Sequence, residues 1–262
     1  MMFPAVPYSR YIVGQIPWYS VLIVAGILTA LLLCTHEEKR RSLQRDTVLD
    51  LALWVIPSGI VGARMYYVLF SWETFAGDPL SILRIWEGGL AIYGGMIAGG
   101  AAVLLFCWRR KLTPLLLTDM IVPGLAIAQA IGRWGNYFNM EAYGEAITDP
   151  AWQFFPVAVQ IQEGGVYVWH MATFFYESVW NAGVFALLWF VVRKRSKRIG
   201  TATLVYMLLY GVGRFMIEGL RTDSLMSGQI RVSQLLSAGL ALTSAAILIC
   251  RAVLPHVRKG GR

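Results

Sequence analysis

The sequence predicts an all-α integral membrane protein with seven transmembrane helices, a polar cavity open to the outer leaflet and a small extracytoplasmic cap. Of the 262 residues, 57% are hydrophobic and only 15% are charged, whereas a soluble domain carries about 25% charged residues. The charges stand in short blocks between long apolar stretches. Because a stretch of about 20 apolar residues can cross a bilayer as a helix, these stretches are predicted spans.

The apolar stretches define one polytopic domain over residues 1–262. Residues 1–16 contain one arginine and two prolines, and no small-residue cleavage site follows the first apolar run, so we expect the first helix to be retained. Pro123 and Gly124 interrupt the fourth stretch, which is therefore the weakest. The predicted spans are 17–34, 47–70, 89–108, 114–131, 171–192, 200–218 and 232–250.

The segment 132–170 is long and of mixed composition. It contains Pro150, Pro156 and the pair Gly164–Gly165. Irregular backbone at membrane depth needs protein or water around it. We therefore expect this segment to form an extracytoplasmic cap or to contain re-entrant pieces.

Lysine and arginine predict the orientation. Most of the 23 basic residues fall in the loops 35–46, 109–113 and 193–199 and in the tail after residue 250. Positively charged loops stay in the cytoplasm. The N-terminus is thus predicted outside and the C-terminus in the cytoplasm, which agrees with an odd number of spans. The net charge of +8 is explained by topology, and nucleic acid is not expected as a partner.

The remaining compositional features point to no cofactor. Cys34, Cys107 and Cys250 all lie at predicted cytoplasmic ends of spans, where disulfides are not expected. Neither these cysteines nor the scattered histidines and carboxylates have metal-ligand spacing, so no metal is predicted.

A polar stripe runs along the sixth span. Tyr206, Tyr210, Arg214 and Glu218 are each four residues apart, and Arg221 follows three later. This spacing places them on one helix face. An arginine within a span costs at least about 2.5 kcal/mol on insertion scales, so it needs a partner or a task. The stripe is either an internal salt bridge between helices or a site for an anionic ligand, since arginine binds phosphate as a planar fork.

Three other segments add polar groups to the predicted outer half. GRWGNYFNMEAYGE at 132–145 places Arg133, two asparagines and Glu141 at a membrane boundary, either as a turn or as ligand donors. Glu177 is a carboxylate in an apolar span, and we expect it to pair with an arginine from another helix. Arg64 lies in the second span, and Tyr93 precedes a glycine pair. Together these groups predict a wet, charged cavity.

The segment 132–145 resembles the signature of prolipoprotein diacylglyceryl transferases, whose core is G-R-x-G-N-x-x-N-x-E-x-x-G. WEGGLAIYGG, FYES and RFMIEGLRTD resemble the same family, and the similarity spans nearly the whole chain. The signature is met by Gly132, Arg133, Gly135, Asn136, Asn139, Glu141 and Gly144.

The resemblance implies a reaction and its partners. The family transfers the diacylglyceryl group of phosphatidylglycerol to the lipobox cysteine in the signal peptide of a prolipoprotein, so that a thioether forms and glycerol phosphate leaves. It implies that Arg133 and Arg214 bind the phosphate and the departing group. Other residues implied to bind or support the substrate are Asn136, Asn139, Glu141, Gly144, Tyr19, Tyr210, Glu218 and Arg221. Arg64 is added to the predicted substrate-binding residues because it is an arginine within an apolar span.

One position departs from the family pattern. Many members have histidine where Tyr93 stands, and that histidine has been considered a base for the thiol. A phenol, with an unperturbed pKa of about 10, is a poor base. We therefore expect positioning and arginine electrostatics to carry the reaction, with Tyr93 in the catalytic set. His170 and Glu141 are further candidates for the base.

Other classes of membrane protein fit less well. A retinal photoreceptor needs a lysine in its last span, and all five lysines lie in predicted cytoplasmic segments. A transporter or channel for an anionic solute is the main alternative, because charged intramembrane residues also mark transport paths. Transporters show paired repeats, which this sequence lacks. A lipid-binding scaffold without catalysis is the third possibility.

Overall fold

The computed structural model describes residues 9–196, 198–222, 226–227 and 230–257. The basic residues Lys197, Arg258, Lys259 and Arg262, which contribute to the predicted orientation, lie outside this range. The chain divides into two compact units, one of residues 1–33 and 118–262 and the other of residues 34–117.

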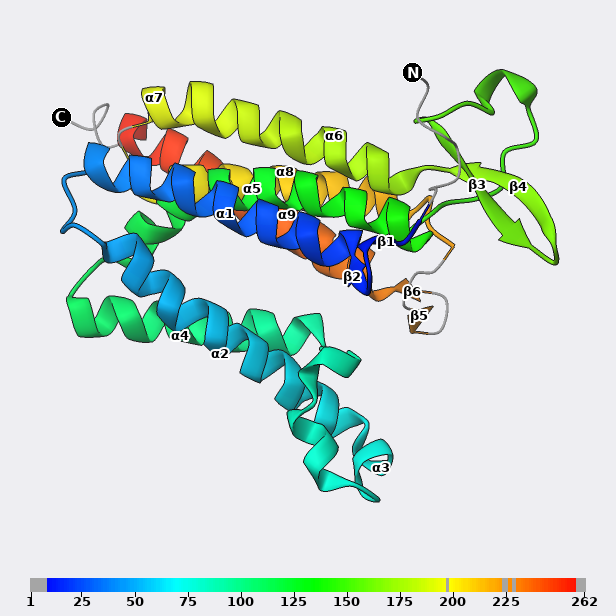
Figure 1. Ribbon diagram of the computed structural model, residues 1–262. Helices are drawn as coiled ribbons and strands as arrows, with labels where there is room; N and C mark the ends of the chain where they lie inside the picture. Colours follow the sequence, from blue (N-terminus) through cyan, green and yellow to red (C-terminus); the bar gives the residue numbers. More distant parts are fainter. Residues whose placement is uncertain (1–8, 197, 223–225, 228–229, 258–262) are drawn as a thin grey trace. The chain divides into compact units, whose positions relative to one another are not determined.

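The first unit is a helical bundle with a β-hairpin at one end (Figure 1). A short pairing of β1 (Tyr11–Val13) with β2 (Ile16–Pro17) leads into α1 (Trp18–Arg40). The helix α5 (Pro114–Asn139) passes Pro123 without a break. The helices α6 (Thr173–Ala186), α8 (Thr201–Glu218) and α9 (Val232–Val257) complete the bundle.

Small residues allow α1 and α5 to pack closely in opposite directions. A Cβ on Gly26 would lie 3.0 Å from the carbonyl oxygen of Ala128, and a Cβ on Gly124 would lie 3.1 Å from the Ala30 backbone. Trp18 stacks on Phe138, with ring centroids 4.9 Å apart. Close approach of backbones at small residues is typical of helix pairs in membranes, where van der Waals contact replaces the hydrophobic effect.

The hairpin lies beyond the N-terminal end of α6. Strands β3 (Ala158–Glu163) and β4 (Val166–Met171) pair antiparallel, with Glu163 opposite Val166. The two-residue turn has φ of 58° at Gly164 and 87° at Gly165. Positive φ at both turn positions is the conformation of a tight hairpin and favours glycine. After α6 the helix continues through a π-helical turn (Leu187–Val192) and α7 (Arg193–Arg195).

The second unit is built on α2 (Thr47–Phe70) and α4 (Ile92–Arg110). A Cβ on Gly62 would lie 2.2 Å from the Cβ of Ala98 and 2.6 Å from the carbonyl oxygen of Gly94. The glycines of α4 thus allow close packing of α4 against α2. Between the two helices lie α3 (Trp72–Phe75) and two 3-10 turns, η1 (Pro79–Leu83) and η2 (Ile85–Glu87).

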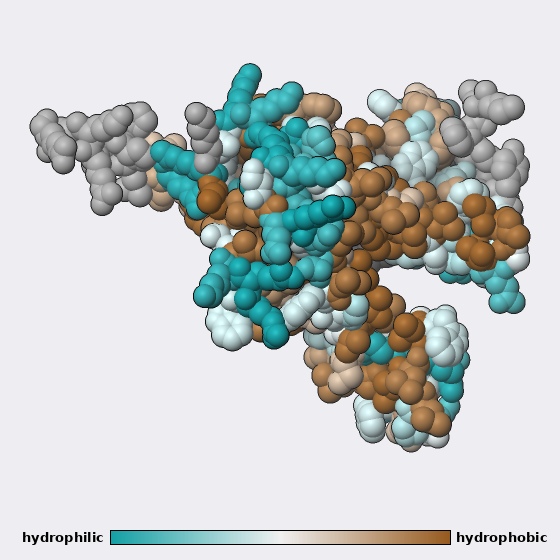
Figure 2. All heavy atoms as spheres, turned by 60° about the vertical axis from the view of Figure 1, so that its left-hand side comes forward, coloured by the Kyte–Doolittle hydropathy of each residue, from teal (hydrophilic) through white to brown (hydrophobic). Residues whose placement is uncertain are grey.

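Six helices of the described residues are long and apolar enough to cross a membrane. They match the predicted spans apart from the sixth, since α8 is not among them. The stripe of tyrosine, arginine and glutamate along α8 lowers its hydropathy. In Figure 2 hydrophilic residues gather at the helix ends that come forward, whereas the flanks are largely apolar. The chain is therefore a multi-pass membrane protein, and the seventh crossing stays a prediction.

Two segments differ from the predicted boundaries. The helix α5 extends to Asn139, eight residues past the expected end of the fourth span at 131, so the first part of the predicted cap is helical. Before α9, β5 (Met226–Ser227) pairs antiparallel with β6 (Ile230–Arg231). A third 3-10 turn, η3 (Pro150–Trp152), precedes the hairpin.

Candidate functional site

A cluster of arginine and glutamate side chains forms where α5, α6 and α8 meet in the first unit. Glu177 of α6 is buried and stands at its centre. One carboxylate oxygen contacts Nε of Arg133 from α5, and the other lies 2.5 Å from Nη1 of Arg214 on α8. The expected pairing of Glu177 with an arginine from another helix is confirmed, and two helices contribute one each.

The stripe on α8 extends this cluster. Arg214 Nη2 lies 2.7 Å from Oε2 of Glu218, one turn later on the same helix. Arg221 Nη1 lies 3.9 Å from Glu177 Oε1. The carbonyl of Glu218 accepts a hydrogen bond from Arg231. Three arginines around two carboxylates give the cluster a formal net charge of +1.

The arginines of the cluster differ in how they are used. The side chain of Arg133 is 24% exposed, against 18% for Arg214 and 12% for Arg221, while Glu177 and Glu218 are almost fully buried. Arg214 spans both carboxylates. Arg133 reaches Glu177 through Nε alone, and no described residue accepts a hydrogen bond from its two terminal nitrogens. Arg133 therefore keeps donors and exposed surface for a ligand.

A small cavity lies against this cluster. Its volume is about 10 Å³, which is roughly the space for one water molecule. Glu177, Arg214, Tyr210 and Trp180 line it. Tyr210 stacks on Tyr206, whose hydroxyl donates to Gln129 Oε1 at 2.9 Å. The polar face predicted for the sixth span is thus turned toward α5 and α6.

The end of α5 carries a second polar group. Asn136 and Asn139 both donate to Oε1 of Glu141, at 2.9 and 3.1 Å. Arg10 in turn donates to the amide oxygen of Asn139 at 3.1 Å. Tyr19 packs on the helix here, since a Cβ on Gly135 would lie 2.6 Å from its ring. Asn136, Asn139, Glu141 and Tyr19 are thereby brought together at one end of α5.

Gly144 connects this end of α5 with the end of α8. Its N–H donates to the carbonyl of Met171 at 2.8 Å, and it forms an isolated β-bridge with Arg221. A Cβ at this position would lie 2.6 Å from the carbonyl oxygen of Leu220. The glycine is therefore needed for close backbone approach beside Arg221.

His170 does not reach the arginine cluster. Its Nδ1 lies 2.8 Å from the carbonyl oxygen of Gly144, and its Nε2 lies 3.2 Å from Glu163. The imidazole packs edge-on against Tyr143. The ring thus joins the hairpin to the 142–147 segment.

Arg64 and Tyr93 belong to the second unit. The guanidinium of Arg64 is buried and donates to the carbonyls of Ser81, Ile82, Gly88 and Gly89 at 2.6 to 3.0 Å. Arg64 thus holds the segment between α2 and α4 in place through backbone carbonyls. The sequence pattern did not predict these partners. Tyr93 is 37% exposed near the start of α4.

Asp119 is a buried carboxylate that the sequence analysis missed. It accepts hydrogen bonds from the N–H groups of Gly200 and Thr203 at 2.7 and 2.8 Å and from the Thr203 hydroxyl. It thus caps the N-terminus of α8, the helix that carries Arg214. Its position five residues after Pro114 near the start of a span is the only signal that the sequence offers.

Comparison with known proteins identifies relatives over almost the whole chain. Residues 8–250 match the family described as prolipoprotein diacylglyceryl transferase. A protein of Limosilactobacillus reuteri is 44% identical over 245 residues, covering 90% of this chain and 87% of the relative. One of Gloeobacter violaceus is 46% identical over 228 residues, covering 86% and 85%. One of Streptococcus agalactiae is 41% identical over 244 residues, covering 93% and 94%. All three are named phosphatidylglycerol–prolipoprotein diacylglyceryl transferase.

Proposed function

Because the chain belongs to the prolipoprotein diacylglyceryl transferase family, we propose that it moves a diacylglyceryl group from phosphatidylglycerol to the lipobox cysteine of a prolipoprotein, with the Arg133–Glu177–Arg214 cluster as its phosphate site. The chain is an enzyme, and its relatives at 41 to 46% identity are named for this transfer. The observation that carries the choice of site is the net positive cluster centred on Glu177.

The reaction places a demand on this site. The sulfur of the cysteine attacks the glycerol carbon that bears the phosphate ester. The C–S bond forms as the C–O bond breaks, and glycerol phosphate leaves with the bonding electron pair. The thiol proton is released, so the departing phosphate carries one more negative charge than the phosphodiester did. Donors aimed at the developing charge lower the barrier most.

Arg133 meets this demand best within the cluster. Its terminal nitrogens are the donors that no described residue engages, and it is the most exposed of the three arginines. Arg214 holds both carboxylates and keeps the cluster assembled. We assign Arg133 to the phosphate directly. Arg214 and Arg221 then supply the surrounding positive charge, and Glu218 supports Arg214.

The remaining predicted residues take supporting roles in this proposal. Asn136, Asn139 and Glu141 form a hydrogen-bonded set one turn beyond Arg133, suited to the hydroxyl groups of a glycerol headgroup. Gly144 supports the backbone at Arg221. Tyr19 and Tyr210 flank the two ends of the site. Arg64 acts within the second unit, where its backbone contacts give it a structural role. The base that accepts the thiol proton is left unassigned, with Tyr93 in the catalytic set.

The proposed location follows from the charge pattern. The loops rich in lysine and arginine face the cytoplasm of a bacterium, and the cluster opens toward the outer leaflet of the cytoplasmic membrane. Both substrates, the phospholipid and the signal peptide, are membrane-bound.

Substitution of Arg133 tests the proposal. In a purified assay with phosphatidylglycerol and a lipobox peptide, followed by mass measurement of the peptide, Arg133→Ala is expected to lower turnover at least 100-fold, since loss of one donor to a developing anion costs about 10²–10³ in rate. Arg133→Lys keeps the charge but loses the fork and is expected to fall in between.

Arg198→Ala is the matched control, because Arg198 is an exposed arginine at the other end of α8 that donates to the carbonyl of Arg251. It should transfer at the rate of the unmodified enzyme. Near-normal turnover in Arg133→Ala would exclude the proposed site. Flux of an anionic solute through proteoliposomes without lipid consumption would instead favour the transporter alternative.

A further inference from the structure

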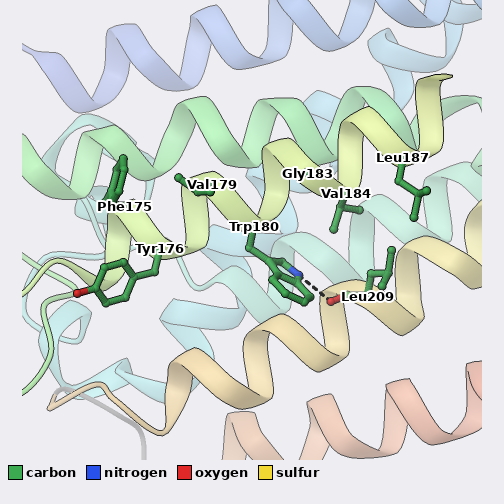
Figure 3. A pocket seen from close by; sticks show the side chains of 8 residues that line it. All are labelled: Phe175, Tyr176, Val179, Trp180, Gly183, Val184, Leu187 and Leu209. Atoms are coloured by element: carbon green, nitrogen blue, oxygen red, sulfur yellow. Dashed lines mark hydrogen bonds between the residues drawn. The ribbon is translucent and has the colours of Figure 1, made fainter. Parts of the chain in front are cut away.

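Two hollows that share Tyr176 lie along α6. The first is a groove of about 520 Å³ between α6 and α8 (Figure 3). Val179, Gly183 and Leu187 line it from α6, and Leu209 lines it from α8. Trp180 also lines the groove, and the one polar atom of its side chain, Nε1, donates a hydrogen bond to the carbonyl of Leu209 at 2.9 Å. The groove therefore presents hydrocarbon to whatever occupies it.

The second hollow lies beyond the N-terminal end of α6. Its volume is about 560 Å³, and its walls include Ile147, Asp149, Trp152 and Met171 from the segments around the hairpin. Tyr176 lines both hollows. Its hydroxyl donates to the carbonyl of Val157 at 2.7 Å, which fixes the ring at the junction. An apolar groove within a span thus continues into a more polar hollow outside it.

We propose that this two-part groove docks the prolipoprotein signal peptide, with the apolar stretch along α6 and α8 and the lipobox residues in the hollow beside the hairpin. The inference rests on the proposed function, which requires a peptide site next to the phosphate site. The signal peptide is a ligand of matching form, because an apolar region of about 7–15 residues is followed by small residues.

The dimensions agree with this occupant. The lining residues of α6 and the turn after it run from Phe175 to Leu187, and at about 1.5 Å per residue this part of the helix is about 18 Å long. An apolar helix of about 12 residues has the same length. Apolar helices are commonly bound by grooves of this kind. A lipid acyl chain could occupy the apolar groove within the span, but it would not occupy the more polar hollow beyond the end of α6.

The position relative to the arginine cluster also agrees. Trp180 forms a wall of the apolar groove and of the small cavity that Glu177 and Arg214 line. Tyr176 immediately precedes Glu177 in α6. A peptide that leaves the membrane past Tyr176 therefore carries its lipobox within one turn of α6 from the centre of the phosphate site.

Photo-crosslinking tests the proposal without any need for turnover. Full-length enzyme in phosphatidylglycerol nanodiscs would carry p-benzoylphenylalanine in place of Val179, Trp152 or Leu242. These positions are 56%, 57% and 71% exposed, and Leu242 of α9 is the control outside the groove. The probe is a synthetic signal peptide with serine in place of its lipobox cysteine.

We expect peptide adducts at positions 179 and 152 and none at 242, with the apolar region joined to 179 and the lipobox region to 152. Lipid adducts alone at 179 would identify an acyl chain as the occupant and overturn the proposal. Peptide adducts of equal yield at 242, or none at either groove position, would also overturn it. Because the serine peptide undergoes no transfer, loss of adducts is distinguishable from failure of the transferase assignment.

A kinetic test uses two glycines that face open space. A Cβ on Gly183 or on Gly239 meets no atom within 4 Å, so both tolerate a larger side chain in the folded protein. Gly183→Phe fills the groove, and we expect at least a 10-fold higher KM for the peptide with an unchanged KM for phosphatidylglycerol. Gly239→Phe on α9 should change neither. A selective rise in the KM for the phospholipid in Gly183→Phe would contradict the proposal.

Discussion

At the scale of single residues, Glu177 supplies the negative charge that holds three arginine side chains together. Three guanidinium groups near one another at membrane depth repel, and each would remain poorly solvated without a counter-charge. Glu177 contacts all three and Glu218 contacts Arg214, yet the cluster keeps a net positive charge. One carboxylate fewer would separate the arginines, and one more would neutralise the site. The ratio of charges suits a site that receives a phosphate.

Removal of the Glu177 carboxylate is therefore expected to affect both stability and activity. Breaking a buried ion pair by removing one partner costs about 3–5 kcal/mol. Glu177→Gln should lower the Tm of the detergent-solubilised enzyme and reduce transfer at least 10-fold, because Arg133 and Arg214 lose their common anchor.

Glu163→Gln provides the comparison for this prediction, since Glu163 is a half-exposed carboxylate on the hairpin. It should leave the Tm within a few degrees of the unmodified protein. An unchanged Tm and unchanged transfer in Glu177→Gln would show that the cluster does not depend on its central carboxylate.

At the scale of secondary structure elements, the site depends on glycines that allow close approach. Gly144 brings the segment after α5 against the end of α8, and Gly213 makes room for Trp180, whose Nε1 would lie 2.2 Å from an added Cβ. Asp119 caps the N-terminus of α8 from α5. The element that carries Arg214 and Glu218 is thus fixed at both ends by contacts that involve no substrate.

Gly144→Ala tests this dependence. The new methyl group would lie 2.6 Å from the Leu220 carbonyl oxygen and 3.0 Å from side-chain carbons of Met171 and Thr173. We expect the segment to move away from Arg221 and transfer to fall about 10-fold or more, although the methyl group adds no charge. Gly77→Ala is the matched control, because a Cβ there meets no atom within 4 Å.

Steady-state kinetics with each substrate varied in turn would measure the effect. The KM for phosphatidylglycerol should rise in Gly144→Ala, since the displaced segment supports the arginine cluster. Equal kinetics for the Gly144→Ala and Gly77→Ala proteins would show that the close approach is not needed for activity.

The pattern of the sequence predicted part of the arginine–glutamate cluster because four-residue spacing on a helix is a local property. The stripe of Tyr206, Tyr210, Arg214 and Glu218 and the need of Glu177 for an arginine partner both follow from helix geometry and from the cost of a charge in a span. The contacts of Arg64 did not follow. Its partners are backbone carbonyls in an irregular segment, and backbone groups leave no trace in the residue pattern.

Of the seven spans predicted from hydropathy, the described residues show six as long apolar helices, and the sixth predicted span stays a prediction. The boundaries of α2 agree with the expected span at both ends. The helix α8 forms as expected, but its polar stripe removes it from the set that is apolar enough to cross. The extension of α5 to Asn139 was hidden because its last residues are polar and glycine-containing, and tertiary contacts with Tyr19 and Trp18 stabilise that turn.

At the scale of the whole molecule, the positive-inside rule predicts the orientation that the proposed chemistry needs. Arg193 and Lys194 follow the π-helical turn at the end of α6, and both lie over aromatic rings. The guanidinium carbon of Arg193 lies 3.8 Å from the ring centroid of Trp189. The hairpin lies at the opposite end of the same helix. If the basic end is cytoplasmic, the hairpin and the arginine cluster face the outer leaflet.

Cysteine labelling decides this orientation. In a variant with Cys34, Cys107 and Cys250 replaced by alanine, a membrane-impermeant maleimide is expected to label Gln162→Cys on the hairpin in intact spheroplasts. Ser196→Cys, which lies after the basic cluster, should react only after permeabilisation. The two positions flank one membrane-spanning helix, so they must give opposite results in any correctly inserted protein. Labelling of Ser196→Cys alone in intact spheroplasts would reverse the orientation and place the arginine cluster at the cytoplasmic leaflet.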